Sequence, residues 1–142
     1  MTAFFDSSVL VAAFYKAHVH HEASLAAIAT ASKKTASCAA HTMAEVYSVM
    51  TRLPVRPRIS PDQGLLFVES IRERFSIVAL SEKEVYEVIA AAAGQGGGGG
   101  KVYDAMILRC AEKSKAEAIY TWNLDDFRQL AGEGIAERLR TP

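Results

Sequence analysis

The stretch TAFFDSSVLVAAFY, residues 2–15, gives the clearest indication of how this chain folds. A short apolar run at 3–5 leads into one carboxylate, Asp6, and two serines, and a second apolar run follows at 9–15. This order predicts a buried strand, a sharp polar turn and a buried helix. In open α/β sheets, ligands bind at the edge where parallel strands end and helices begin. We therefore interpret Asp6 as the first member of a carboxylate cluster, to which the rest of the chain contributes the other members.

Length and composition indicate one domain, residues 1–142, with a single core, because the chain has 142 residues and is 50% hydrophobic. Lys+Arg and Asp+Glu are both 16, so no global basic field marks a nucleic-acid binder, and RNA binding would need local patches. We interpret Cys38 and Cys110 as buried free thiols of a reducing compartment. Neither a signal peptide nor an apolar run of ~20 residues is present, so we expect a cytoplasmic protein without membrane contact.

Short β-like runs alternate with longer helical patterns along the chain. The expected strands are 3–5, 35–38, 76–80, 118–121 and a last one near 135–139. The expected helices are 8–15, 22–31, 43–53, 61–75, 82–93, 102–113 and 124–130. Ser60-Pro61 and Ser81-x-x-Glu84 are typical helix starts. Such alternation predicts an α/β fold with a parallel sheet covered by helices on both faces.

Two loops differ in composition from the rest of the chain. Residues 53–61 (LPVRPRISP) form a stiff basic connection, and residues 94–100 (GQGGGGG) form a flexible connection between helices. The ending Gly100-Lys101 suggests a P-loop, but the first glycine position holds Gln95, the Ser/Thr position holds Val102, and a helix precedes the loop. A domain that binds a phosphorylated small molecule would need a glycine turn after a strand, which this sequence lacks.

Two further acids open helices. Glu45 borders the apolar face of the helix 43–53, and Asp104 borders the apolar face of the helix 102–113. A carboxylate against an apolar face is unfavourable without a compensating charge, and a metal ion supplies more charge than a helix N-terminus. Each acid also has a purely structural interpretation. Glu45 would form a capping box with Thr42, and Asp104 would be a first-turn acid favoured by the helix dipole.

The fourth polar site is TWNLDDF, residues 121–127, directly after a predicted strand. Asn123 is a good N-cap residue, and Asp125 and Asp126 fall in the first helical turn, so capping and dipole effects alone would explain them.

The order of these sites suggests a common function. Each follows or adjoins a β-like run and opens a helix, and all such points lie at one edge of a parallel sheet. Carboxylates brought together repel each other unless a divalent cation holds them. Oxygen ligands suit Mg²⁺ or Mn²⁺, and such a site can activate water for phosphodiester cleavage. Four segments supply these residues: FFDSSVLVAAF with Asp6, MAEVYSVMTRLP with Glu45, GGKVYDAMILRCAE with Asp104, and IYTWNLDDF with Thr121 and Asn123.

At these residues the chain resembles the PIN-domain family of metal-dependent nucleases, and within it the VapC-type ribonuclease toxins. The resemblance covers nearly the whole chain. It implies a three-layer α/β/α PIN-like fold with a central parallel β-sheet. It also implies Mg²⁺- or Mn²⁺-dependent endoribonuclease activity on RNA, a homodimer, and inhibition by a cognate VapB-type antitoxin.

The resemblance also implies roles for individual residues. Asp6, Glu45 and Asp104 would hold the metal, and Asn123 and Asp126 would complete the catalytic site. Many members have Asp where this chain has Asn123, which adds no charge, so Asp126 is the candidate to supply it. Ser8 and Thr121 would place hydroxyls beside the cluster. Because of Asn123, a catalytically weak PIN-like module that binds RNA or protein is the alternative function.

Other residues have a functional and a structural interpretation. His18, His20 and His21 suggest zinc, but no closing ligands follow, and they better suit a helix start. A phosphate-contacting rim, or merely a solvated face, would comprise Arg52, Arg56, Arg58, Lys101 and Arg109. Three aromatic residues beside the acidic segments would stack bases or pack in the core: Tyr47, Tyr103 and Trp122.

Overall fold

The computed structural model describes residues 2–142, which build one five-stranded parallel sheet in the order β3-β2-β1-β4-β5. The strands are β1 (Ala3–Phe5), β2 (Ala36–Ala39), β3 (Ser76–Val78), β4 (Ala118–Tyr120) and β5 (Leu139–Arg140). All five predicted strands are present. The last one lies later than the expected 135–139, because Glu133–Ala136 form a short helix and the chain joins the sheet only at Leu139.

Within residues 2–142 the seven predicted helices are present, most of them with shifted ends, and a short helix that was not predicted follows them. The helices are α1 (Ser7–Phe14), α2 (His21–Ile28), α3 (Ala40–Arg52), α4 (Pro61–Arg74), α5 (Glu82–Gly94), α6 (Lys101–Ser114), α7 (Leu124–Leu130) and α8 (Glu133–Ala136). Ser60 and Ser81 both form the capping boxes expected from their sequences. The largest shift of a helix start is in α3, which begins at Ala40 rather than at residue 43, directly after β2.

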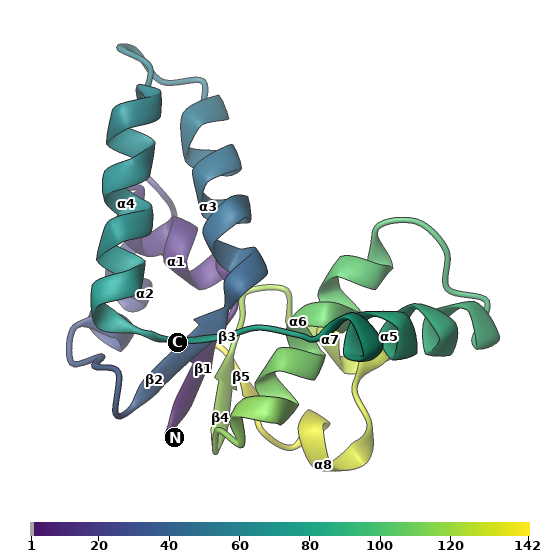
Figure 1. Ribbon diagram of the computed structural model, residues 1–142. Helices are drawn as coiled ribbons and strands as arrows, with labels where there is room; N and C mark the ends of the chain where they lie inside the picture. The colour runs from purple at the N-terminus through teal and green to yellow at the C-terminus, as the bar shows by residue number, and fades with distance from the viewer. Residues whose placement is uncertain (1) are drawn as a thin grey trace.

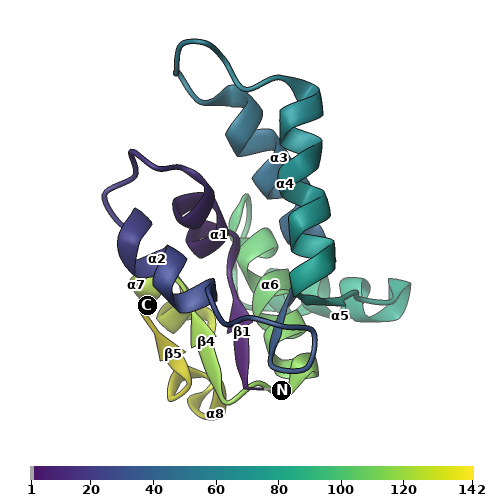
Figure 2. The ribbon, with the colours of Figure 1, turned by 90° about the vertical axis from the view of Figure 1, so that its left-hand side faces the viewer.

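Helices cover both faces of the sheet and give a three-layer α/β/α arrangement (Figures 1 and 2). Consecutive strand residues point to opposite faces, and Phe4 and Phe5 accordingly belong to different cores. Phe5 packs with residues of α1, α2, α3 and α4, whereas Phe4 packs with residues of α6 and α7. Cys38 and Cys110 are buried and free, as the sequence indicated.

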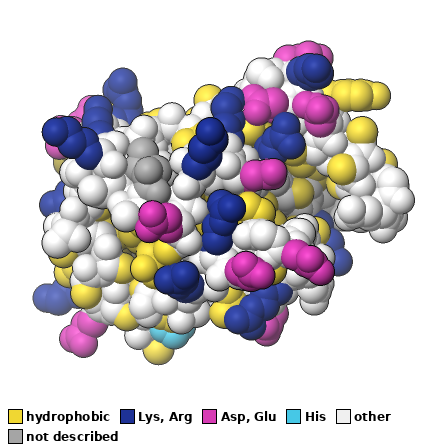
Figure 3. Space-filling model, turned by 90° about the horizontal axis from the view of Figure 1, so that it is seen from below, with side chains coloured by type: hydrophobic (Ala, Val, Ile, Leu, Met, Phe, Trp, Pro, Cys, Tyr) yellow, Lys and Arg dark blue, Asp and Glu magenta, His cyan; other side chains and the backbone are white. Residues whose placement is uncertain are grey.

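The hairpin of α3 and α4 stands away from the sheet, and the proline-rich loop lies at its far end (Figure 1). The opposite, lower face of the molecule carries Lys and Arg interspersed with Asp and Glu, without a separate patch of either sign (Figure 3). None of the helices within residues 2–142 has the length and apolar character that crossing a membrane requires.

Candidate active site

Asp6 lies at the carboxyl end of β1 and is the N-cap residue of α1. Its side chain is only 4% exposed. Its Oδ2 accepts hydrogen bonds from the hydroxyls of Ser8, at 2.7 Å, and Thr121, at 2.9 Å. Burial raises the pKa of Asp6, and these hydrogen bonds partly oppose that effect.

The same two hydroxyls bind the turn that follows β4. Ser8 Oγ accepts a hydrogen bond from the backbone N–H of Trp122, and Thr121 Oγ1 accepts one from the backbone N–H of Asn123, both at 3.0 Å. Each hydroxyl therefore accepts from the backbone and donates to Asp6. This arrangement fixes the position of the carboxylate relative to the end of β4.

Glu45 lies in the second turn of α3, and the predicted capping box with Thr42 is wrong. Because the helix begins at Ala40, Thr42 is already inside it and is fully buried. The carboxylate accepts a hydrogen bond from Ser7 Oγ at 3.0 Å, and His41 Nε2 lies 3.6 Å from its Oε1. Burial raises the pKa of Glu45, the contacts with Ser7 and His41 lower it, and the charge of Asp6 raises it further.

Asp104 lies in the first turn of α6 and is half-buried. Burial raises its pKa to about 6, and the negative charges of Asp6, Glu45 and Asp126 act in the same direction. The helix dipole alone would lower this pKa. Asp104 lies in the first helical turn, as the dipole interpretation requires, and burial and the neighbouring acids raise its pKa.

Asn123 lies in the turn after β4 and Asp126 lies in the first turn of α7, and both residues are exposed. Asn123 occupies the N-cap position of α7, but its side chain makes no capping hydrogen bond, so the predicted structural role of that side chain is wrong. Asp126 lies close enough to Asp104 for its charge to raise the Asp104 pKa. It lines an adjoining depression together with Asp104 and Lys101.

These residues meet at the carboxyl edge of the sheet, as the sequence predicted. A cavity of about 310 Å³ is lined by Asp6, Ser7, Ser8, Val11, His18, Glu45, Val49, Asp104, Trp122 and Asn123. Four of the five predicted site residues therefore line one cavity, and Asp126 lines the depression beside it. The chain segments that supply them are far apart in sequence.

The donor set fits a hard divalent cation in its chemistry. It consists of carboxylate oxygens, and the pKa of each of Asp6, Glu45 and Asp104 is raised, so nearby positive charge would stabilise their ionised forms. Within residues 2–142, no three His, Cys, Asp or Glu side chains are already grouped as a metal-ligand set. In this structure the hydroxyls of serine and threonine residues donate hydrogen bonds to carboxylate oxygens of Asp6 and Glu45.

The histidines near the cavity have other contacts. His18 Nδ1 accepts a hydrogen bond from the backbone N–H of His20, and His21 Nδ1 lies 2.9 Å from the carbonyl oxygen of Ala12. His21 begins α2, as expected, although His20 makes no side-chain cap. These contacts agree with the structural interpretation of the three histidines.

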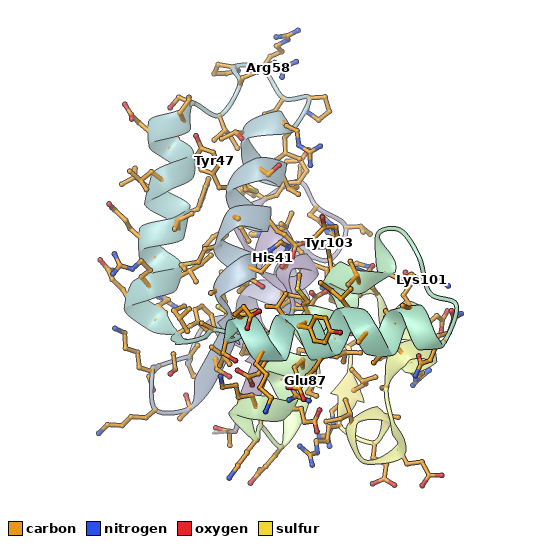
Figure 4. The ribbon with its side chains drawn as sticks, turned by 45° about the vertical axis from the view of Figure 1, so that its right-hand side comes forward. His41, Tyr47, Arg58, Glu87, Lys101 and Tyr103 are labelled. Atoms are coloured by element: carbon orange, nitrogen blue, oxygen red, sulfur yellow. The ribbon has the colours of Figure 1, made fainter. Side chains whose placement is uncertain are left out.

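The predicted basic rim forms only in part. Lys101 lines the depression beside Asp104, but Arg109 lies near Glu84, at 4.0 Å, and Glu87, at 3.7 Å, and faces α5. Arg58 lies at the far tip of the α3–α4 hairpin (Figure 4).

Sequence analysis missed the contacts that Ser7 and His41 make with Glu45. Ser7 directly follows Asp6. His41 precedes Glu45 by four residues, and side chains at this spacing are neighbours on a helix, so the contact between His41 and Glu45 could have been predicted once Glu45 was a candidate. The contact between Ser7 and Glu45 joins α1 to α3 and has no local signal in the sequence.

Comparison with known proteins identifies the family. A sequence model of the PIN domain matches residues 3–133. Ribonuclease VapC27 from Mycobacterium tuberculosis is 31% identical over 113 residues, which cover 79% of this chain and 78% of the relative. Ribonuclease VapC40 from the same species is 32% identical over 135 residues, which cover 95% of this chain and 92% of the relative. With these matches and its α/β/α fold, the chain belongs to the PIN-domain family, in its VapC-type group.

Proposed function

We propose that this protein is a Mg²⁺- or Mn²⁺-dependent endoribonuclease that cleaves RNA phosphodiester bonds by hydrolysis. The observation that carries the proposal is the shared cavity of Asp6, Glu45 and Asp104, in which the pKa of every carboxylate is raised. The names of the VapC27 and VapC40 relatives, both ribonucleases, support RNA as the substrate.

In this proposal Asp6, Glu45 and Asp104 hold the cation. When bound, the ion supplies positive charge that stabilises the charge developing on the phosphate and makes water a stronger nucleophile. The hydroxyls of Ser8 and Thr121 hold Asp6 in place, and Ser7 orients Glu45. Asn123 and Asp126 complete the site beside Asp104, and Lys101 offers a positive charge to the RNA backbone.

The direct test is RNA cleavage by variants of the purified protein in Mg²⁺. Asp6→Asn and Asp104→Asn keep the size of each side chain and remove its charge, so we expect cleavage to fall to background. The matched control is Asp125→Asn, which removes an exposed acid from the same turn as Asp126 and should leave the rate unchanged. Undiminished cleavage by both Asp6→Asn and Asp104→Asn would contradict the proposal.

We further propose that the ribonuclease is a cytoplasmic toxin that forms a homodimer and is inhibited by a cognate VapB-type antitoxin. Membership of the VapC-type group supports this role. Induced expression should arrest growth, and co-expression of a cognate VapB-type antitoxin should restore growth. Growth arrest that persists with Asp104→Asn would show that RNA cleavage does not cause it.

The alternative is a catalytically weak module that binds RNA or protein. The specific observation in its favour is Asn123, a neutral side chain in the cavity. RNA binding without metal-dependent turnover would favour this alternative.

A further inference from the structure

Tyr103 is the most exposed of the three aromatic residues beside the acidic segments, since Tyr47 is 38% exposed and Trp122 is partly buried. Trp122 donates its Nε1–H to Ser24 at 2.8 Å and stacks on His20, with ring centroids 3.7 Å apart and planes at 6°. Tyr47 packs closely against the backbone of Gly64 in the α3–α4 hairpin. Tyr103 is 52% exposed.

One face of Tyr103 is held by His41. The two rings are parallel, with planes at 1° and centroids 5.4 Å apart, which is an offset stack. The pair bridges α3 and α6, and the two side chains face each other at the carboxyl edge of the sheet (Figure 4). The stack therefore orients Tyr103 before any ligand arrives, and the remaining exposed surface of its ring is already positioned.

This aromatic pair lies beside one of the three carboxylates and is next to a second in the sequence. Tyr103 directly precedes Asp104, and His41 Nε2 lies 3.6 Å from Glu45 Oε1. The contact of His41 with Glu45 places the aromatic pair next to the cavity, although neither ring is among the residues that line it. Aromatic side chains that bind single-stranded nucleic acid do so by stacking on the bases, which tolerates any base identity.

We propose that Tyr103, held in place by His41, is a substrate-binding residue that stacks on the nucleotide base next to the cleaved phosphodiester bond. This inference rests on the proposed ribonuclease function and adds a base-binding site to it. The base would extend the existing stack of His41 and Tyr103, while the adjoining phosphate reaches the carboxylates.

The first test compares Tyr103→Leu with Tyr103→Phe in RNA cleavage with saturating Mg²⁺. Losing the ring should raise the half-saturating RNA concentration about tenfold, in line with the measured value of one base stack, and leave the maximum rate within about twofold. Tyr103→Phe keeps the ring and should behave like the unaltered protein. Tyr86→Leu is the matched control, since Tyr86 is a 67% exposed tyrosine on α5, a helix that contains none of the proposed site residues.

The second test removes the base instead of the ring. Two oligoribonucleotides each carry one abasic nucleotide, placed directly before or directly after the cleaved bond. One of the two should bind the unaltered protein about tenfold more weakly than the oligoribonucleotide with all its bases. Tyr103→Leu should be insensitive to that change, because the two deletions remove the same contact. Additive losses in the double change would overturn the inference.

Two other outcomes of the first test would also contradict the inference. A maximum rate lowered by Tyr103→Leu at unchanged half-saturation would mean that Tyr103 only positions Asp104. Equal losses in Tyr103→Phe and Tyr103→Leu would assign the effect to the hydroxyl group. If the unaltered protein shows no metal-dependent cleavage, the proposed ribonuclease function fails. If the unaltered protein cleaves RNA and Tyr103→Leu cleaves it equally well, only the base-stacking role of Tyr103 fails.

Discussion

Thr121 donates its hydroxyl proton to Asp6 from a fully buried position. Valine has nearly the same shape, so Thr121→Val would keep the packing but leave Asp6 Oδ2 and the Asn123 N–H each without this partner. We expect the free energy of unfolding to fall by about 1–3 kcal/mol. RNA cleavage should fall roughly 10–100-fold, because groups that orient metal ligands typically have effects of this size.

Urea unfolding and cleavage rates measure these two effects of Thr121→Val. The control is Thr30→Val, which alters an exposed threonine and should change neither quantity. Full activity in Thr121→Val would show that the hydroxyl does not position Asp6 for the reaction.

Asp104 gives the metal-free protein a specific pH dependence. Its pKa is about 6 in the folded protein, against an ordinary value of 3.8, so the folded state binds more protons than the unfolded state between these values. Its favourable contribution to stability is therefore present below pH 3.8 and is lost as the pH rises through about 6. Above that pH the ionised carboxylate destabilises the fold.

Asp104→Asn should remove this pH dependence. In EDTA at pH 8 the variant should be more stable than the unaltered protein by about 1 kcal/mol, which is below the full linkage value because water screens a half-exposed carboxylate. Near pH 3.8 the two proteins should be closer in stability. Urea unfolding at both pH values measures the difference, and a variant that is less stable at pH 8 would contradict the assigned pKa.

At the scale of elements, Gly64 lets α4 approach α3 closely. A Cβ at this position would lie 2.8 Å from Thr51 Cγ2 and 3.1 Å from the Tyr47 ring. Gly64→Ala should therefore lower the free energy of unfolding by about 1–3 kcal/mol through overpacking. This loss outweighs the gain of roughly 1 kcal/mol that alanine brings to a helix.

Gly94→Ala is the matched control for Gly64→Ala. Gly94 is the last residue of α5, and a Cβ there would meet nothing within 4 Å. Its replacement should be neutral or stabilising by up to about 1 kcal/mol. Equal stability changes in the two variants, measured by urea unfolding, would show that the hairpin does not need the close approach.

The elements were predicted well where local signals and tertiary structure agree. The capping boxes of Ser60 and Ser81 mark α4 and α5 correctly, because both helices begin in exposed loops. The same signal failed at Thr42, since β2 passes directly into α3 at Ala40 and no loop separates them. The backbone N–H of Asn123 donates a hydrogen bond to Thr121 Oγ1, a partner that the helix-cap pattern does not predict.

At the scale of the whole molecule, parallel topology explains why the site was predictable. Carboxyl ends of parallel strands meet at one edge, so acids that follow strands converge whatever their separation in sequence. Contacts between side chains of different helices have no such rule. The bond from Ser7 to Glu45 and the stack of His41 on Tyr103 depend on how α1, α3 and α6 pack, which the sequence pattern does not specify.

We propose that Asp6, Glu45 and Asp104 form one divalent-cation centre. Anomalous scattering from a crystal of the protein grown with Mn²⁺, at a concentration that supports RNA cleavage, tests it most directly. An anomalous peak should lie within ligand distance of all three carboxylates, and that peak should be lost in Asp104→Asn. A peak held by other side chains, or no peak in the cavity at that concentration, would contradict it.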